Sequence, residues 1–146
     1  MIKKLLKFIY PLLPNSKLRS IILRFCGYTI GMNVYLSSTF KISDLKSRKN
    51  NVIIGNRVSF GPSVLIITDS SPNNSKLFKL FPLESKDVLI DDDAWIGANV
   101  SILPGVTIGK CSVVGTGSVV TESIPAYSIA VGVPAKVIKK INPDEL

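Results

Sequence analysis

The strongest constraint on this chain is an apolar side chain that recurs at every sixth residue. Counting in sixes from Ile30 to Val120, thirteen of the sixteen positions are aliphatic or Phe, and the exceptions are Arg48, Pro72 and Glu84. The apolar content of 46% gives only about seven such positions by chance. A second column of apolar or small residues lies four positions after these starts. It consists of Val34, Phe40, Val52, Val58, Val64, Val88, Ala94, Val100, Val106, Ser112 and Ser118.

Short strands joined by bends explain a period of six residues. Side chains alternate between the two faces of a strand, so both columns point inward when the chain bends between strands. Three such segments close a triangular coil, and stacked coils bury one continuous apolar core. The alternative, an ordinary antiparallel sheet, predicts two-residue turns and gives no reason for a period of six. The repeat therefore predicts an all-β fold, a parallel β-helix.

Glycine follows the first position of the repeat at six places, residues 31, 55, 61, 97, 109 and 115. Glycine tolerates a positive φ and lets two backbones approach closely. We expect both properties at these positions, where the coil bends.

The repeat divides the chain into three parts. Residues 1–27 carry no repeat, residues 28–125 form the predicted β-helix, and residues 126–146 form a tail that leaves the repeat. Within the β-helix the pattern fails at 72–83, which predicts a loop that leaves after residue 71 and returns by residue 84. Such loops often carry function, although an insertion without function is the alternative.

The first 27 residues predict two short helices with basic polar sides. The apolar residues with helical spacing are Ile2, Leu5, Leu6 and Ile9, then Leu18, Ile21, Ile22 and Phe25. Ser16 is the expected N-cap of the second helix and Gly27 its C-cap. Such a segment either lies on an anionic membrane surface or plugs the open end of the first coil, and both roles are compatible.

Charge and cysteine content limit the partners of the chain. The net charge of +8 favours anionic partners such as nucleotide phosphates and acidic lipid headgroups. Nucleic acid is not expected, because no recognition motif is present. Cys26 and Cys111 form no CxxC pair and the chain has no histidine, so we expect no zinc and no other metal. The cysteine pattern indicates a reducing cytoplasm, and no apolar run is long enough to span a bilayer.

Three stretches resemble the hexapeptide-repeat acyltransferases. They are residues 95–109 (WIGANVSILPGVTIG), 114–121 (VGTGSVVT) and the Ile-Pro at 124–125 followed by 132–138 (GVPAKVI). The likeness covers about residues 28–141 and is strongest to galactoside and maltose O-acetyltransferases. It implies a left-handed β-helix, a homotrimer and acetyl-CoA bound between neighbouring subunits. The small size and basic N-terminus suggest the members that modify bacterial surface polysaccharides or their lipid-linked precursors.

The resemblance also implies roles for individual residues. Trp95 and Ala98 match positions beside the acetyl and pantetheine groups, and Thr116 and Thr121 match further pantetheine contacts, although the family usually has Ala at position 116. Lys136 and Lys139 match basic residues near the nucleotide phosphates, for which a lysine is a suitable point charge. The alternative is that Trp95 is a packing residue and the lysines are a solvated surface.

The family's general base is a histidine, and its position falls on Ser71-Pro72 in this chain. A serine with an ordinary pKa cannot act as a base, but Asp69 lies two residues away and could serve if burial raised its pKa. Ser71 could instead hold a water or orient the acceptor, and a neighbouring subunit could supply the base. Loss of catalysis is the remaining alternative.

Three functions fit these observations. The first is an acetyl-CoA-dependent O-acetyltransferase that acts on a sugar. The second is a trimeric module that binds CoA or glycan without transfer. The third is N-acetylation of an amino sugar, because an amine depends less on a base.

Overall fold

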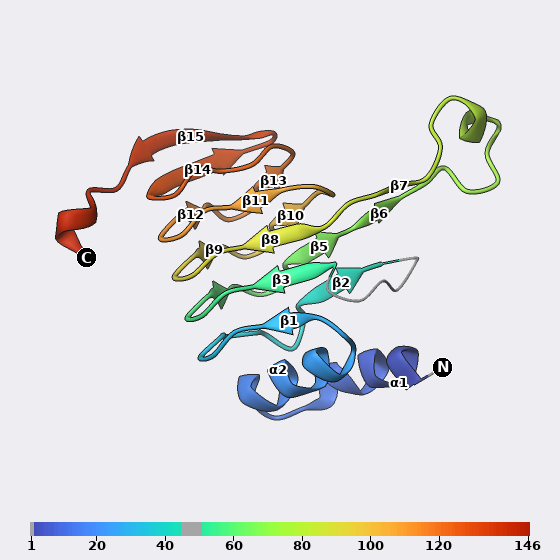
Figure 1. Ribbon diagram of the computed structural model, residues 1–146, viewed down its shortest axis with the longest axis horizontal. Helices are drawn as coiled ribbons and strands as arrows, with labels where there is room; N and C mark the ends of the chain where they lie inside the picture. The colour runs from blue at the N-terminus through green and yellow to red at the C-terminus, as the bar shows by residue number, and fades with distance from the viewer. Residues whose placement is uncertain (1, 45–50) are drawn as a thin grey trace.

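The computed structural model describes residues 2–44 and 51–146. Short strands are stacked in three sheets, with two helices at one end of the stack and a hairpin at the other (Figure 1). Sheet A contains β1 (Thr29–Ile30), β3 (Val52–Ile54), β8 (Val88–Ile90) and β11 (Thr107–Ile108). Sheet B contains β4 (Ser59–Phe60), β9 (Trp95–Ile96), β12 (Val113–Val114), β14 (Ser128–Gly132) and β15 (Ala135–Lys140). Sheet C contains β2 (Lys41–Ser43), β5 (Leu65–Ile67), β10 (Ser101–Ile102) and β13 (Val119–Val120).

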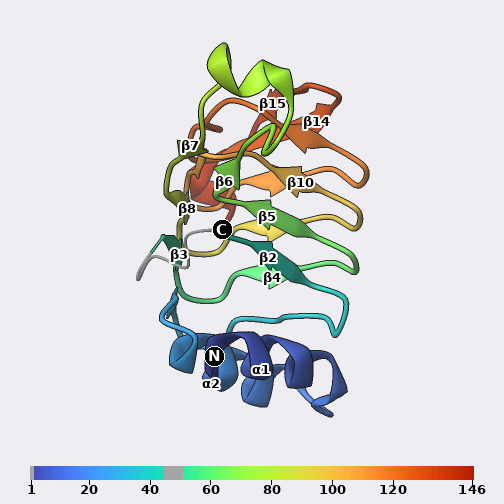
Figure 2. The ribbon, with the colours of Figure 1, turned by 90° about the vertical axis from the view of Figure 1, so that its right-hand side faces the viewer.

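The chain visits sheets A, B and C in turn, and its first circuit adds to sheet B only the single bridge between Tyr35 and Ser59. The strands within a sheet pair in parallel, except that β14 and β15 are antiparallel. Figure 2 looks onto sheet C, with the turns from sheet B along one edge. This arrangement confirms the predicted solenoid of parallel strands.

Both columns of the repeat form the core. Phe60, Ile66, Ile96 and Ile102 of the first column are fully buried, as are the valines of the second column between residues 52 and 100. Arg48, an exception in the first column, lies outside the described residues. Each fully buried Val or Ile removes apolar surface worth about 1.5–3 kcal/mol from water, so this shared interior is the main source of stability.

The distance along the chain between stacked strands is not constant. Ile30 pairs with Ile54, Ile54 with Ile90, and Ile90 with Ile108, so successive steps in sheet A cover 24, 36 and 18 residues. Only the last step is a plain three-segment coil. The first two steps are longer than this coil by 6 and 18 residues, and the 18 extra residues leave the solenoid between sheet C and sheet A. The register of six survived these breaks because the extra segments are themselves multiples of six.

The second extra segment is longer than the predicted 72–83 loop. Between β5 and β8 the chain forms β6 (Asp69–Ser70) and β7 (Glu84–Ser85), which pair antiparallel outside the three sheets. The 3₁₀ helix η2 (Lys76–Lys79) lies at the far end of this projection (Figures 1 and 2). With β6 and β7 the projection covers residues 69–85, which is three residues before and two residues after the segment that the repeat pattern excluded.

The prediction that the repeat glycines carry a positive φ was wrong. Positive φ occurs two residues later, at Asn33, Arg57, Ser63, Asp93, Asn99, Gly105, Cys111 and Gly117. The repeat glycines are required for close approach instead. A Cβ at Gly97 would lie 2.6 Å from Thr116 N, and one at Gly61 would lie 2.6 Å from Ala98 N.

Two helices, α1 (Ile2–Ile9) and α2 (Ser16–Phe25), form a cap under the first coil, joined by the 3₁₀ helix η1 (Tyr10–Leu12). Tyr10, Leu23 and Cys26 extend the core into this cap. The N-cap of α2 is Asn15, whose side chain accepts from Leu18 N–H, and not the predicted Ser16. Among the described residues no helix is long and apolar enough to cross a membrane.

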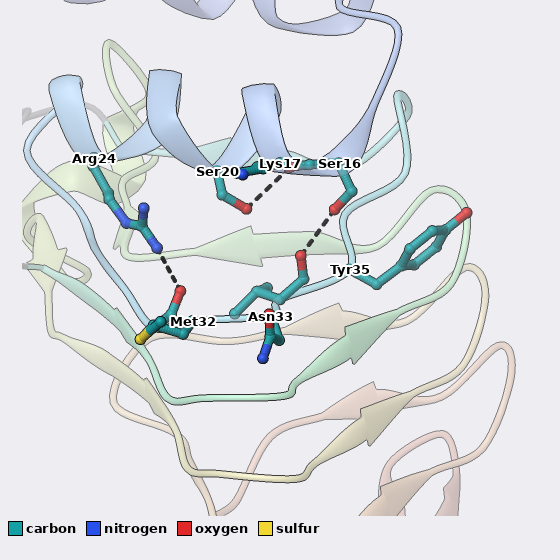
Figure 3. A pocket seen from close by; sticks show the side chains of 9 residues that line it. Ser16, Lys17, Ser20, Arg24, Met32, Asn33 and Tyr35 are labelled. Atoms are coloured by element: carbon teal, nitrogen blue, oxygen red, sulfur yellow. Dashed lines mark hydrogen bonds between the residues drawn. The ribbon is translucent and has the colours of Figure 1, made fainter.

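Ser16 fastens the cap to the solenoid. Its hydroxyl donates to Val34 O at 2.8 Å (Figure 3). The same hydroxyl accepts from Leu36 N–H at 2.7 Å. Arg24 donates from Nε to Ile30 O at 2.9 Å and from Nη2 to Gly31 O at 2.6 Å. These bonds satisfy backbone carbonyl groups and one backbone N–H that the first coil cannot pair with another strand.

A buried charge cluster also holds the cap. Asp44 binds Lys3 Nζ at 2.8 Å, Lys7 Nζ and the Tyr28 hydroxyl, and both ammonium groups lie over the Tyr28 ring. Burial alone raises the pKa of Asp44, but hydrogen bonds from Lys3, Lys7 and Tyr28 outweigh it and lower that pKa. Burial and the hydrogen bond to Asp44 raise the pKa of the Tyr28 hydroxyl.

Asp44→Asn is expected to lower the free energy of unfolding by about 3 kcal/mol at pH 7, because two lysines lose their carboxylate. A lowered pKa stabilises the folded state above the unfolded-state pKa, about 3.9, and the stabilisation is lost as pH falls through the folded-state pKa. Urea unfolding at several pH values measures both effects, with Asp144→Asn as the control. Equal stability of Asp44→Asn and wild type at pH 7 would contradict the role of the cluster.

Candidate functional site

A row of outward-facing side chains, exposed at its two ends and half-buried between them, crosses the outer face of sheet B. Trp95 pairs with Val113, Val113 with Ile129, and Ile129 with Lys139. Residues that face each other directly across parallel or antiparallel strands project on the same side of the sheet. Trp95 is 60% exposed, so it is not a core packing residue. Three strand spacings separate Trp95 from Lys139, which is about 14 Å.

Ala98 and Thr116 lie one above the other where sheet B turns into sheet C. Gly117 N–H donates to Ala98 O at 2.8 Å, and Gly97 brings the two coils together beneath Thr116. Ala98 is half-buried and Thr116 is exposed. This corner therefore offers backbone and small side chains beside the Trp95 face, a surface on which a thin extended chain can lie.

Thr121 and Lys136 lie near the last coil. Thr121 is exposed directly after β13, and the next residue, Glu122, binds Lys136 Nζ through Oε2 at 3.1 Å. Lys136 pairs with Val131 at the edge of sheet B, close to Lys139 on the same strand. The structure thus brings the two predicted phosphate-binding lysines together on β15, with Lys136 partly neutralised by Glu122.

A pocket of about 630 Å³ lies at the base of the projecting hairpin. Its lining consists of Ser70, Ser71, Pro72, Leu80, Phe81, Pro82 and Glu84. Ser71 Oγ accepts from Asn73 N–H at 3.0 Å, which leaves the Ser71 O–H able to donate into this space. The predicted catalytic residue Asp69 is only 4% exposed and is not part of the lining.

Glu84 is a candidate that the sequence analysis missed. It pairs with Ser70 across the β6–β7 hairpin, lines the same pocket as Ser71, and binds Lys86 Nζ at 2.5 Å. Its signal in the sequence is a carboxylate that interrupts the apolar column of the repeat. A carboxylate at this place can accept a proton from an alcohol bound beside Ser71.

The two halves of the candidate site lie on different sides of one solenoid. The pocket with Ser71 and Glu84 opens where sheet C leads into sheet A, whereas Trp95 projects from sheet B. In a triangular cross-section that corner is opposite sheet B, so one chain does not bring the two halves together. No group of three or more metal-ligating side chains occurs in residues 2–44 and 51–146.

Known proteins share both the repeat and the arrangement of the strands. Residues 87–122 match the family model described as bacterial transferase hexapeptide (six repeats). The chain is 32% identical to a maltose O-acetyltransferase from Clostridium difficile 630, with a TM-score of 0.70 over 96% of this chain and 84% of that structure. The chain belongs to the hexapeptide-repeat acetyltransferases. A galactoside acetyltransferase solved in complex with coenzyme A is 28% identical, with a TM-score of 0.70 over 98% of this chain and 80% of the other.

Curated hexapeptide-repeat acetyltransferases are longer than this chain. The galactoside O-acetyltransferase of Lactococcus lactis subsp. lactis (strain IL1403) is 40% identical over 112 residues, which is 77% of this chain and 52% of the relative. The chain therefore spans about half the length of the curated relatives it matches. It also differs from the histidine-dependent pattern that its motifs resemble, because it contains no histidine.

Proposed function

We propose that this chain is an acetyl-CoA-dependent O-acetyltransferase whose acceptor is a sugar hydroxyl. The observation that carries the proposal is the row on sheet B, which begins at an exposed tryptophan and ends at a lysine on β15. The similar proteins named as galactoside and maltose O-acetyltransferases support a sugar acceptor. We further propose that this sugar belongs to a bacterial surface polysaccharide or its lipid-linked precursor.

We propose that acetyl-CoA lies along this row. Lys139 and Lys136 would bind the nucleotide phosphates as point charges. The pantetheine arm would lie against the corner at Ala98 and Thr116, where a larger side chain would hold it away from the backbone. Thr121, which follows β13 in sheet C, is the further pantetheine contact that the family resemblance implies. The acetyl group would then lie beside Trp95. The likeness to a galactoside acetyltransferase in complex with coenzyme A supports this assignment.

We propose that a homotrimer completes the site. We call the pocket lined by Ser71 and Glu84 the acceptor pocket, and the row from Trp95 to Lys139 the Trp95 row. They lie on opposite sides of one solenoid, so a neighbouring subunit must bring its acceptor pocket to the row. From the resemblance to the hexapeptide-repeat acyltransferases we also infer that the β-helix of this chain is left-handed. The free thiols of Cys26 and Cys111 support a reducing compartment such as the cytoplasm.

We propose Glu84 as the general base in place of histidine. The acceptor hydroxyl would give its proton to the Glu84 carboxylate while its oxygen bonds to the thioester carbonyl carbon. The carbon–sulfur bond then breaks, and the departing CoA sulfur takes that proton to leave as a thiol. Ser71 would orient the acceptor, and Asp69, buried behind it, is the alternative base. N-acetylation of an amino sugar would use the same geometry with less need of a base.

The phosphate assignment predicts that Lys139→Ala weakens acetyl-CoA binding about tenfold at low salt, which is about 1.4 kcal/mol. Lys136→Ala is expected to have a smaller effect, because Glu122 already neutralises part of its charge. Both losses of acetyl-CoA affinity should become smaller as the salt concentration is raised. Isothermal titration measures them, with Lys17→Ala on the cap as a control of equal charge change. Unchanged affinity of the two β15 variants at low salt would remove the phosphate assignment.

A further inference from the structure

The helix α1 is oriented with Lys3 and Lys7 toward the protein and with three of its apolar residues toward solvent. Lys3 and Lys7 point inward to Asp44 and the Tyr28 ring, and Leu6 and Tyr10 pack on the core. The opposite side of the helix carries Leu5, Phe8 and Ile9. A helix that served only as a plug would place polar residues on this outer side.

The outward apolar side chains continue beyond α1. We call the exposed large apolar residues of the cap the cap face: Leu5, Phe8, Ile9, Leu12, Leu18 and Phe25. Phe8, Leu12 and Phe25 are each 76% exposed. Scattered apolar residues are ordinary on a protein surface, but six large ones exposed within α1, η1 and α2 indicate an interaction site.

The charge of this end of the molecule selects the partner. Residues 1–43 contain seven Lys and Arg and no Asp or Glu. Arg19 and Arg24 donate to backbone carbonyl oxygens, so these contacts leave their positive charge uncompensated. Asp44 supplies a single negative charge to two lysines. A bilayer that contains acidic lipids has an anionic surface above an apolar interior. An apolar face within a segment whose charged residues are all cationic complements both of these properties.

We propose that the cap docks on an anionic bilayer surface, with the cap face inserted at the level of the lipid headgroups. The cap lies at one end of the solenoid, away from β14 and β15 at the other end (Figure 1). The inner side of the cap is already bonded to the first coil through Ser16 and Arg24 (Figure 3). Docking therefore needs no rearrangement of the solenoid and leaves the Trp95 row accessible. The proposal does not depend on acyl transfer.

Co-sedimentation with vesicles tests the docking. The full chain is mixed with vesicles of phosphatidylcholine alone or of phosphatidylcholine with phosphatidylglycerol. We expect binding to the anionic vesicles at least about fivefold tighter than to the neutral ones, weakening as salt is raised, since each cation near the surface contributes about 1 kcal/mol. The triple variant Leu5→Gln, Phe8→Gln, Leu12→Gln should bind the anionic vesicles about a hundredfold more weakly.

A matched control uses the projecting hairpin. Leu77→Gln, Leu80→Gln, Phe81→Gln changes two exposed leucines and one exposed phenylalanine, as the cap variant does, and should bind like wild type. Circular dichroism establishes that both variants are folded. Equal vesicle binding by wild type and the cap variant would overturn the proposal. It would also be overturned if wild type ignored anionic vesicles while the cap variant lowered the molar mass in light scattering, since the cap face would then join two copies of this chain.

Discussion

Replacing Glu84 with Gln is expected to lower kcat by about 10²–10⁴-fold, the usual loss when a general base is removed. The substitution keeps the shape of the side chain but removes its ability to accept a proton. Glu84 lies in the acceptor pocket and not on the Trp95 row, so acetyl-CoA affinity should change less than about twofold. Steady-state kinetics with saturating acetyl-CoA and a sugar acceptor measure the effect.

Two further variants give this result its meaning. Asp69→Asn removes the other carboxylate in the β6–β7 pair, where the hairpin leaves the solenoid. Glu145→Gln removes an exposed carboxylate near residue 146. We expect Glu145→Gln to behave as wild type and Asp69→Asn to retain more turnover than Glu84→Gln. If Asp69→Asn abolished transfer while Glu84→Gln kept wild-type kcat, the base would be Asp69 and our assignment from the pocket lining would be wrong.

Gly97→Ala is expected to destabilise the protein by about 3 kcal/mol, at the upper end of what overpacking a core usually costs. The added Cβ would lie 2.6 Å from Thr116 N, a backbone atom that cannot move without separating two coils. Because Ala98 and Thr116 form the proposed pantetheine surface, the variant should also bind acetyl-CoA more weakly. Urea unfolding followed by circular dichroism measures the stability change.

Gly117→Ala measures the cost of an unfavourable backbone conformation without the cost of a steric clash between coils. Gly117 has a φ of +75° and nothing within 4 Å of its missing Cβ. Its replacement should cost only about 1–2 kcal/mol, the cost of a left-handed conformation. A Gly97→Ala protein that is as stable as Gly117→Ala, or more stable, would show that the coils are not packed as tightly as we describe.

The sequence predicted the core of the solenoid well because its cause is local. In a six-residue segment that bends once, the two inward positions are fixed by strand alternation, so Ile96 and Val100 are identified without knowledge of their neighbours. The alternation also explains why Trp95, one residue before a buried position, projects outward. Its exposure was left open at the sequence level because tryptophan occurs both in cores and on binding surfaces.

Other features depend on which segments meet across coils, and these were not predictable. Gly97 adjoins Thr116 only because successive coils stack there. The left-handed residue of a bend is Asn, Ser or Asp at four of the eight bends and Gly at only two. Glu84 reaches the pocket only because β7 folds back on β6. The inverted orientation of α1 depends on Asp44, which helical spacing alone cannot place beneath Lys3 and Lys7.

Release of the CoA thiol in the presence and absence of a sugar acceptor tests most directly whether this histidine-free chain transfers acetyl groups. We expect wild type to release thiol from acetyl-CoA in an acceptor-dependent manner, with an equal amount of acetylated sugar detected by mass spectrometry. Acetyl-CoA binding in the calorimeter without acceptor-dependent thiol release, over a panel of galactosides, maltose and polysaccharide fragments, would contradict the transferase and favour a module that only binds.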